Sequence, residues 1–304
     1  MTGAGHAQTT RVPARTVAAP ARVDGVGLFT AAKTSAVFRP AEPGTGLRFD
    51  VDGSAIPAVI DRLSDRPVHP AFEGMSARNT TLAADPTDPK SPRAVTTEHA
   101  LAALVGLGIT DCVVELHTDD GPRRRDVEVP IDDGSARAFV GAILAVGVRD
   151  LGTDAEAVRV DTTLAVQKDD ASVSAGAGGA YAYELDYGPR SPLGRQSATL
   201  IPAAGVFAET IAPARTFSLE HEATAMHAAG LFRHISPRDL LVIGERGPID
   251  NAYRFNNEPA AHKLLDLMGD LALVGRPMIA DVRGVRSGHA LNHELARRIV
   301  ASVS

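Results

Sequence analysis

Residues 96–108 read TTEHALAALVGLG, and this stretch predicts a short buried helix within a β-rich region. Thr96 or Thr97 can cap the start of the helix, and the two glycines at the other end of the stretch can end it. The leucines and the valine between them recur every three to four residues, which is typical of a helix face that packs on a core. His99 is therefore expected in the first turn of a buried helix.

The segments on either side of this helix have a different pattern. Residues 15–38 alternate apolar and polar side chains, which predicts strands. Eight prolines lie within residues 40–95, and they exclude long helices there, apart from a short one near 58–61. Residues 135–146 again have a helical apolar face, and the glycine that follows can end this second helix.

The second half of the chain contains the same kinds of element. We expect its strands at 157–167, 172–174, 181–187, 195–202, 240–243 and 278–285, and its helices at 218–229, 259–274 and 289–300. The fold class is therefore α+β. We expect a disordered tail at 1–14 and two domains of similar topology, a β-sheet with two helices each, at 15–152 and 153–304.

The composition excludes several classes of protein. Among 304 residues, 31 are basic and 37 acidic, so the net charge of −6 gives no electrostatic support for binding nucleic acid. The single cysteine, Cys112, excludes a disulfide framework and a cysteine-based zinc cluster, and its apolar neighbours place it in the core. The chain has neither an apolar run of the ~20 residues that span a bilayer nor the apolar segment of a signal peptide. We expect a cytoplasmic monomer without stable membrane insertion.

A candidate metal site lies in residues 262–270, which read HKLLDLMGD. His262 and Asp266 are four residues apart, so they share one helix face, and Asp270 continues the same stripe. Two such ligands suit a tetrahedral zinc ion. A pair with this spacing also arises by chance in a chain of this composition, and a surface helix of mixed charge is the alternative.

Two further histidine motifs are candidates for the same site. Glu98 and His99 are adjacent, which would place a carboxylate base next to a third ligand, whereas a hydrogen-bonded core histidine is the alternative. His289 and His293 share a helix face and could themselves ligate a metal, or they could cap a helix terminus. Neither the serine elbow of hydrolases nor a phosphate-binding loop of the Walker type occurs.

Five motifs occur along the chain in a fixed order: VTTEH at 95–99, IDDGSA at 131–136, ARTF at 214–217, HKLLDLMGD at 262–270 and SGHALN at 287–292. In this order they resemble the UDP-3-O-acyl-N-acetylglucosamine deacetylases, zinc amidases that commit a sugar nucleotide to lipid A synthesis. The match runs from about Arg15 to the end of the chain. The resemblance implies two α+β domains whose helices pack between two sheets.

The resemblance also implies the metal site and the base. His99, His262 and Asp266 would hold Zn²⁺, or Fe²⁺, and leave one position open for water. Glu98 would take a proton from that water as it attacks the N-acetyl carbonyl. Thr216 would donate a hydrogen bond to the oxyanion that forms.

Other roles follow from the same resemblance. His289, held charged by Asp270, would stabilise the oxyanion or protonate the leaving amine. Lys263 would reach the diphosphate of the UDP-linked amino sugar, and Phe217 would also contact the substrate. The function implied is hydrolysis of the N-acetyl group with release of acetate.

One segment departs from the family pattern. Where relatives typically have a Gly-Gly-Ser turn beside the passage for the 3-O-acyl chain, residues 232–237 read FRHISP. Because side chains such as His234 and Ile235 would fill space that glycine leaves open, we expect a passage that is narrowed, rerouted or absent. A second reading is therefore an amidase acting on another N-acyl substrate. A third is a non-catalytic protein that binds a sugar nucleotide or a metal.

Overall fold

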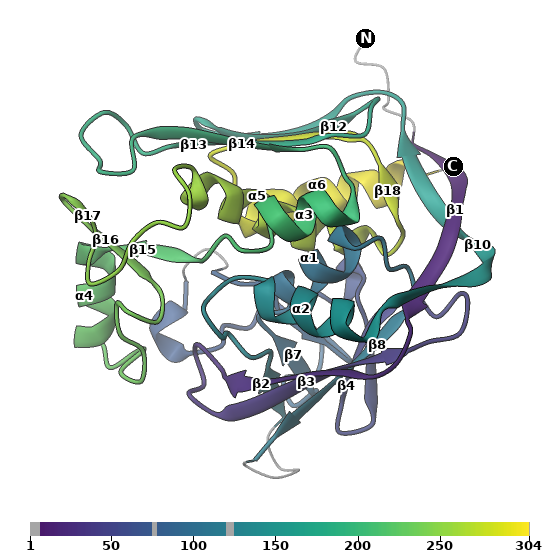
Figure 1. Ribbon diagram of the computed structural model, residues 1–304, viewed down its shortest axis with the longest axis horizontal. Coiled ribbons are helices and arrows are strands. Elements are labelled where there is room, and N and C mark those ends of the chain that lie inside the picture. The colour runs from purple at the N-terminus through teal and green to yellow at the C-terminus, as the bar shows by residue number, and fades with distance from the viewer. Residues whose placement is uncertain (1–6, 75–77, 120–124, 304) are drawn as a thin grey trace.

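Two five-stranded mixed sheets enclose the helices of this protein (Figure 1). The computed structural model describes residues 7–74, 78–119 and 125–303. The first sheet has the order β2 (Ala21–Val26), β3 (Lys33–Pro40), β8 (Cys112–Thr118), β4 (Leu47–Val51) and β5 (Ser54–Pro57). The second has the order β11 (Leu164–Lys168), β12 (Ala171–Gly176), β19 (Asp281–Val285), β13 (Tyr181–Asp186) and β14 (Arg195–Leu200).

The helices lie in the space between these sheets, apart from α4, which lies at one side (Figure 1). They are α1 (Glu98–Gly106), α2 (Arg137–Val146), α3 (Ala204–Thr210), α4 (Glu220–Ala228), α5 (Glu258–Leu271) and α6 (His289–Ser302). Helix α2 packs on β2, whereas α5 and α6 pack on strands of the second sheet and on each other. The predicted α+β class and the predicted position of the helices between two sheets are confirmed.

Three smaller sheets and three single turns of 3-10 helix complete the fold. The sheets have the orders β1 (Ala7–Val17), β10 (Val148–Val160), β18 (Met278–Ile279); β6 (Leu82–Ala83), β7 (Arg93–Val95), β9 (Asp126–Glu128); and β15 (Phe217–Leu219), β16 (Leu241–Gly244), β17 (Gly247–Pro248). The 3-10 turns are Ile60–Arg62, Pro70–Phe72 and Ala272–Val274. None of the helices within the described ranges has the length and the apolar character needed to cross a membrane.

The start of the described chain differs from the expectation. Residues 7–14 belong to β1, which pairs with β10 from Ala7 opposite Val160 onward, so the predicted disordered tail at 1–14 is wrong for these residues. Backbone hydrogen bonds to a strand far along the chain order this polar segment, and the composition of the segment alone does not reveal such pairing. The expected domain boundary at 152 falls inside β10, and the division into two domains stays a prediction.

Most predicted helices occur within two or three residues of the expected positions, and Cys112 is buried as expected. Two local differences have clear causes. The segment 217–219 forms β15 beside β16, so α4 begins two residues later than expected. Helix α3 was not predicted, because seven residues are too few to establish a helical period; Phe207 is buried against Gly106 of α1.

Helices α1 and α5 touch at Gly269. A Cβ atom at this position would overlap the carbonyl oxygen of Glu98, so the backbones can approach this closely only with glycine. His99 follows Glu98 on α1, and Asp266 and Asp270 flank Gly269 on α5. The close approach of the two backbones therefore brings the polar residues of both helices together.

Replacing Gly269 by alanine is expected to lower the free energy of unfolding by about 1–3 kcal/mol, because the added methyl group must push α1 and α5 apart. Urea denaturation would measure the change. Gly141→Ala is the matched control: Gly141 lies in α2, a Cβ there would meet nothing within 4 Å, and alanine favours the helix. Equal stability of the Gly269→Ala variant and the wild type would contradict the tight contact.

Candidate metal and catalytic site

Three buried side chains from two helices lie close together. His99 lies on α1, and His262 and Asp266 lie on α5. The Nε2 atoms of both histidines are 3.4 Å from Asp266 Oδ1, and one ligand atom from each residue lies within 4.8 Å of the others. In a tetrahedral zinc site two ligand atoms are about 3.3 Å apart, given Zn–N and Zn–O bonds near 2.0–2.1 Å. The three donors therefore fit a divalent metal ion.

The surroundings hold the ligands in the states that a metal needs. His262 Nδ1 lies 3.1 Å from the carbonyl oxygen of Ala214, an arrangement in which Nδ1–H donates and Nε2 keeps its lone pair. Burial lowers the pKa of His262 to about 3, so its ring is neutral. Burial alone would raise the pKa of Asp266, but His262 and Lys263 bring it well below its usual value. Lys263 Nζ is 2.8 Å from Asp266 Oδ2.

Glu98 is a buried carboxylate next to this cluster. Its side chain is 3% exposed, and Oε2 accepts a hydrogen bond of 2.9 Å from the backbone N–H of Thr80. Burial raises the pKa of Glu98, although the charges of His289 and His99 act in the opposite direction. A carboxylate with a raised pKa is suited to accept a proton near neutral pH.

Asp270 and His289 form a second buried pair. His289 Nδ1 lies 2.9 Å from Asp270 Oδ2, and Asn292 Nδ2 donates to the same oxygen at 2.8 Å. Burial alone would lower the pKa of His289, but Asp270 raises it to about 9. The His289 imidazole is therefore charged at neutral pH. Burial alone would raise the pKa of Asp270, but the neighbouring histidines outweigh it and lower that pKa. His293 completes this group, with Nε2 3.4 Å from Asp270 Oδ1.

The predicted substrate-contacting residues lie at the edge of the cluster. Lys263 Nζ is 5.8 Å from the centre of the Phe217 ring, which also makes an edge contact with His262. The Tyr187 ring makes an edge contact with the Phe217 ring, and the two ring centres are 6.2 Å apart. Thr216 is half-buried, and its backbone N–H donates to the carbonyl oxygen of Gly134 at 2.7 Å. Lys263 thus contacts Asp266 and Phe217 contacts His262, while Thr216 directly precedes Phe217 in the chain.

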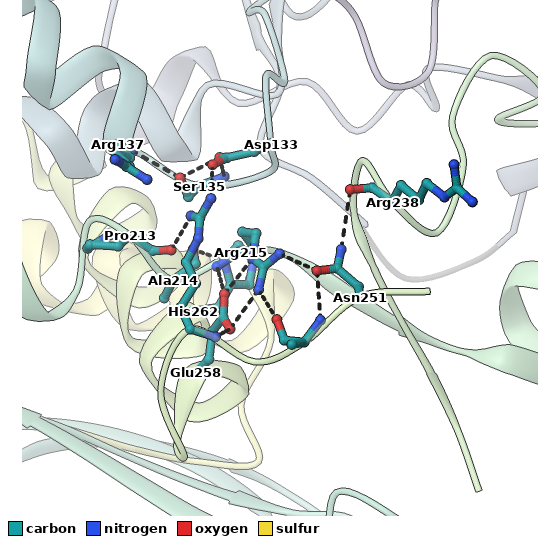
Figure 2. A network of polar contacts seen from close by, with 12 residues as sticks. Asp133, Ser135, Arg137, Pro213, Ala214, Arg215, Arg238, Asn251, Glu258 and His262 are labelled. Carbon is teal, nitrogen blue, oxygen red and sulfur yellow. Dashed lines mark hydrogen bonds and ion pairs between the residues drawn. The ribbon is translucent and has the colours of Figure 1, made fainter. Parts of the chain in front are cut away.

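The loop before β15 is tied to α5 by a buried ion pair (Figure 2). Arg215 Nε donates to Glu258 Oε1 at 2.7 Å, and Nη2 donates to Oε2 at 3.0 Å. Arg215 also donates to the side chain of Asn251. Such a bidentate contact fixes geometry as well as contributing energy. It fixes the loop whose Ala214 carbonyl oxygen lies against His262 Nδ1.

Known proteins resemble this chain over most of its length. The family model described as UDP-3-O-acyl N-acetylglycosamine deacetylase matches residues 14–301. A deacetylase of that name from Myxococcus xanthus (strain DK1622) is 33% identical, over 95% of this chain and 87% of the relative. One from Synechocystis sp. (strain ATCC 27184 / PCC 6803 / Kazusa) is 34% identical, over 93% and 97% of the two chains. The chain belongs to the UDP-3-O-acyl-N-acetylglucosamine deacetylase family.

Some residues of this site were not found from the sequence. Thr80 contacts both Glu98 and Asp270, and Asn292 donates to Asp270, but no role was predicted for either. Arg215 lies in one of the motifs that mark the deacetylase family, yet its partner Glu258 is 43 residues away. A threonine or an asparagine has no spacing pattern of its own, so only the motifs themselves could have drawn attention to these residues.

The alternative in which His289 and His293 ligate a metal of their own is not favoured. Asp270, His289 and His293 do offer three ligand atoms within 4.8 Å of one another. However, Thr80 Oγ1 and Asn292 Nδ2 already donate to the two oxygens of Asp270, and each histidine turns a nitrogen toward the same carboxylate. The arrangement is a hydrogen-bonded group around one charge.

A cavity of about 400 Å³ opens beside Thr216 and Phe217, between α4, β15 and β16. Phe232 and Ile235, from the segment 232–237 that differs from the family pattern, form part of its wall. His234 does not fill the space, because its Nε2 lies 3.0 Å from the carbonyl oxygen of Gly27. An acyl passage that is narrowed, rerouted or absent stays a prediction.

Proposed function

We propose that this chain hydrolyses the N-acetyl group of a UDP-3-O-acyl-N-acetylglucosamine and releases acetate, the step that commits this sugar nucleotide to lipid A synthesis. The names of the relatives support this substrate, and family membership supports the reaction class. One structural observation carries the proposal: two histidines and one carboxylate converge at 3.4 Å beside a second buried carboxylate and a charged imidazole. This combination supplies what metal-dependent amide hydrolysis uses: a site for the ion, a base and an acid.

His99, His262 and Asp266 would hold a zinc ion, with Fe²⁺ as the alternative that the same donors accept. When bound, the ion supplies Lewis-acid chemistry for attack of water on an amide carbonyl. The neutral ring of His262 and the ionised Asp266 match this role, because ligands must be deprotonated to bind a metal.

The chain's own residues would handle the protons and the developing charge. Glu98, whose pKa is raised by burial, takes the proton of the attacking water. Thr216 donates a hydrogen bond to the oxyanion of the tetrahedral intermediate. His289, charged through Asp270, stabilises that oxyanion or gives its proton to the amine that leaves.

Other groups would bind the remaining parts of the substrate. Lys263 supplies positive charge for the diphosphate, and Phe217 offers an aromatic face next to it. The apolar wall of the 400 Å³ cavity, with Phe232 and Ile235, would receive the 3-O-acyl chain. A monomer in the cytoplasm stays our prediction for the state and place in which the protein acts.

The direct test is acetate release by the zinc-loaded protein from the UDP-linked substrate, compared with an otherwise identical sugar nucleotide that has no fatty chain. We expect turnover of the first and weaker turnover of the second. Preference for the sugar without the chain would favour an amidase with a different N-acyl substrate. Binding of one equivalent of zinc without hydrolysis of any N-acetyl amino sugar would favour the non-catalytic reading.

Asp270→Asn is expected to move the alkaline limb of the pH profile. The pKa of His289 is raised to about 9, so the charged form is present below that value and kcat/KM falls as the pH rises through it. Without the charge of Asp270, burial lowers the pKa of His289, and the limb moves to lower pH. The measurement is kcat/KM against pH, with the exposed Asp61→Asn as control. An alkaline limb at the same pH in both variants would contradict the assignment to His289.

Phe232→Gly is expected to raise turnover of long-chain relative to short-chain substrates. Phe232 lines the cavity, contacts the Phe29 ring and has a φ of 56°, a conformation that glycine adopts without strain. Removing the ring widens the cavity, and glycine keeps the backbone conformation at this position without strain. Turnover would be measured over a series of acyl lengths. Asp52→Gly, at a φ of 51° in the β4–β5 turn, is the control for backbone relief alone, and an identical length preference in all three proteins would refute the narrowing.

A further inference from the structure

Thr80 lies in the loop before β6 and contacts both Glu98 and the Asp270–His289 pair. The sequence predicted no role for it. We propose that Thr80 is a positioning residue that fixes Glu98 and the Asp270–His289 pair relative to one another. This inference rests on the proposed function, since it concerns the same reaction. It assigns no contact with the substrate or the metal to Thr80 itself.

The two contacts use different parts of the residue. The backbone N–H of Thr80 donates to Glu98 Oε2 at 2.9 Å, and its hydroxyl donates to Asp270 Oδ1 at 2.5 Å. The residue is fully buried. Glu98 lies on α1 and Asp270 on α5, so one residue outside both helices is bonded to the reactive carboxylate of each. A rotation of the Thr80 side chain would break the contact with Asp270 alone, whereas a shift of its backbone would change both distances.

The hydroxyl of Thr80 has its hydrogen-bonding capacity in use. An ionised carboxylate only accepts, so the one hydroxyl proton goes to Asp270, and a lone pair remains for the N–H of His293, whose Nε2 is 2.9 Å away. This chain of donors fixes the oxygen Oδ1 of Asp270. Asn292 fixes Oδ2, and His289 Nδ1 then has one orientation in which to meet the carboxylate.

Thr80 is itself held from a separate direction. Its carbonyl oxygen accepts from the backbone N–H of Thr97 at 2.9 Å and from the Thr97 hydroxyl at 3.1 Å. Thr97 stands at the start of α1, where a hydroxyl would otherwise cap the helix, and no side-chain cap is formed there. The hydroxyl that could stabilise α1 instead fixes Thr80, which is consistent with a role in placing the reactive groups.

The decisive variant is Thr80→Val, which keeps the shape and the backbone N–H but removes the hydroxyl. We expect kcat to fall about 10- to 100-fold, the usual cost of losing a partner behind a catalytic group, with KM and bound zinc unchanged. Thr80→Ser keeps the hydroxyl and should restore most of kcat. If Thr80→Val does not fold, Thr80→Ala replaces it, because a smaller side chain adds no crowding, and the same loss is expected.

Thr81→Val is the matched control. Thr81 is the next residue and is buried, but its hydroxyl accepts from Asn79 and not from the catalytic groups. A kcat equal to wild type in Thr80→Val or its alanine substitute, an equal loss in Thr81→Val, or failure of Thr80→Ser to recover activity would overturn the proposal. A loss confined to KM or to zinc content would also overturn it, because a positioning role predicts an effect on kcat.

A spectroscopic measurement separates this inference from the proposed function. The ¹⁵N resonances of the His289 and His293 rings report on their hydrogen bonds to Asp270 and Thr80. We expect both to shift in Thr80→Val and to stay in place in Thr81→Val. If the wild type hydrolysed no N-acetyl amino sugar, the proposed function would fail while these spectra would still test Thr80. Unshifted ring resonances in Thr80→Val would reject the positioning role whatever the activity.

Discussion

Glu98→Gln is expected to lower kcat by about 10²- to 10⁴-fold, the usual contribution of a general acid or base. Glutamine has nearly the same shape and can still accept the hydrogen bond from Thr80 N–H, so the site keeps its geometry. It cannot take a proton from water. Zinc content and KM should therefore stay close to wild type, and steady-state kinetics together with metal analysis would measure all three quantities.

Glu128→Gln is the matched control for this prediction. Glu128 is also a fully buried glutamate with a pKa raised by burial, and it bonds to Thr30, Phe29 and Thr96 rather than to the metal ligands or to Asp270. We expect this variant to change stability and to leave kcat nearly intact. Comparable kcat losses in the two variants would show that burial of a carboxylate, and not proton transfer at Glu98, explains the effect.

His99→Ala is expected to abolish tight zinc binding and to reduce activity by more than the roughly 10- to 100-fold that losing an outer-shell partner costs. His99 is the most informative ligand to remove, because its described contacts are with Asp266 and with the ring of His262. Equilibrium dialysis with zinc and measurement of acetate release would test both effects. His117→Ala, at an exposed histidine of β8, should behave as wild type. One tightly bound equivalent of zinc in His99→Ala would exclude His99 as a ligand.

Helical spacing alone predicted that His262, Asp266 and Asp270 share one face, because a helix repeats every 3.6 residues whatever its surroundings. The distance between that face and His99 could not be obtained in this way. It depends on the contact of α1 and α5 at Gly269, and glycine at this position has no periodic signature. The five ordered motifs supplied the link between the two helices, since they point to a known arrangement.

The limits of the fold prediction have the same origin. Helices such as α2 and α5 were found because their apolar residues form a stripe, and α2 ends at Gly147 as expected. Strand β1 was missed because its order comes from hydrogen bonds to β10, which lies more than 130 residues away along the chain. Thr80 was missed for a related reason, because its partners Glu98 and Asp270 are 18 and 190 residues distant.

The contact of α1 with α5 also has a thermodynamic consequence. One proposed ligand comes from α1 and two come from α5, so all three can bind one ion only when the helices are docked, and the affinity for the ion contributes to holding them together. By mass action, free zinc at a thousand times its dissociation constant would add about 4 kcal/mol to the apparent stability. Chelators should therefore lower the melting temperature, and the size of that change reports how rigidly the apoprotein keeps its ligands aligned.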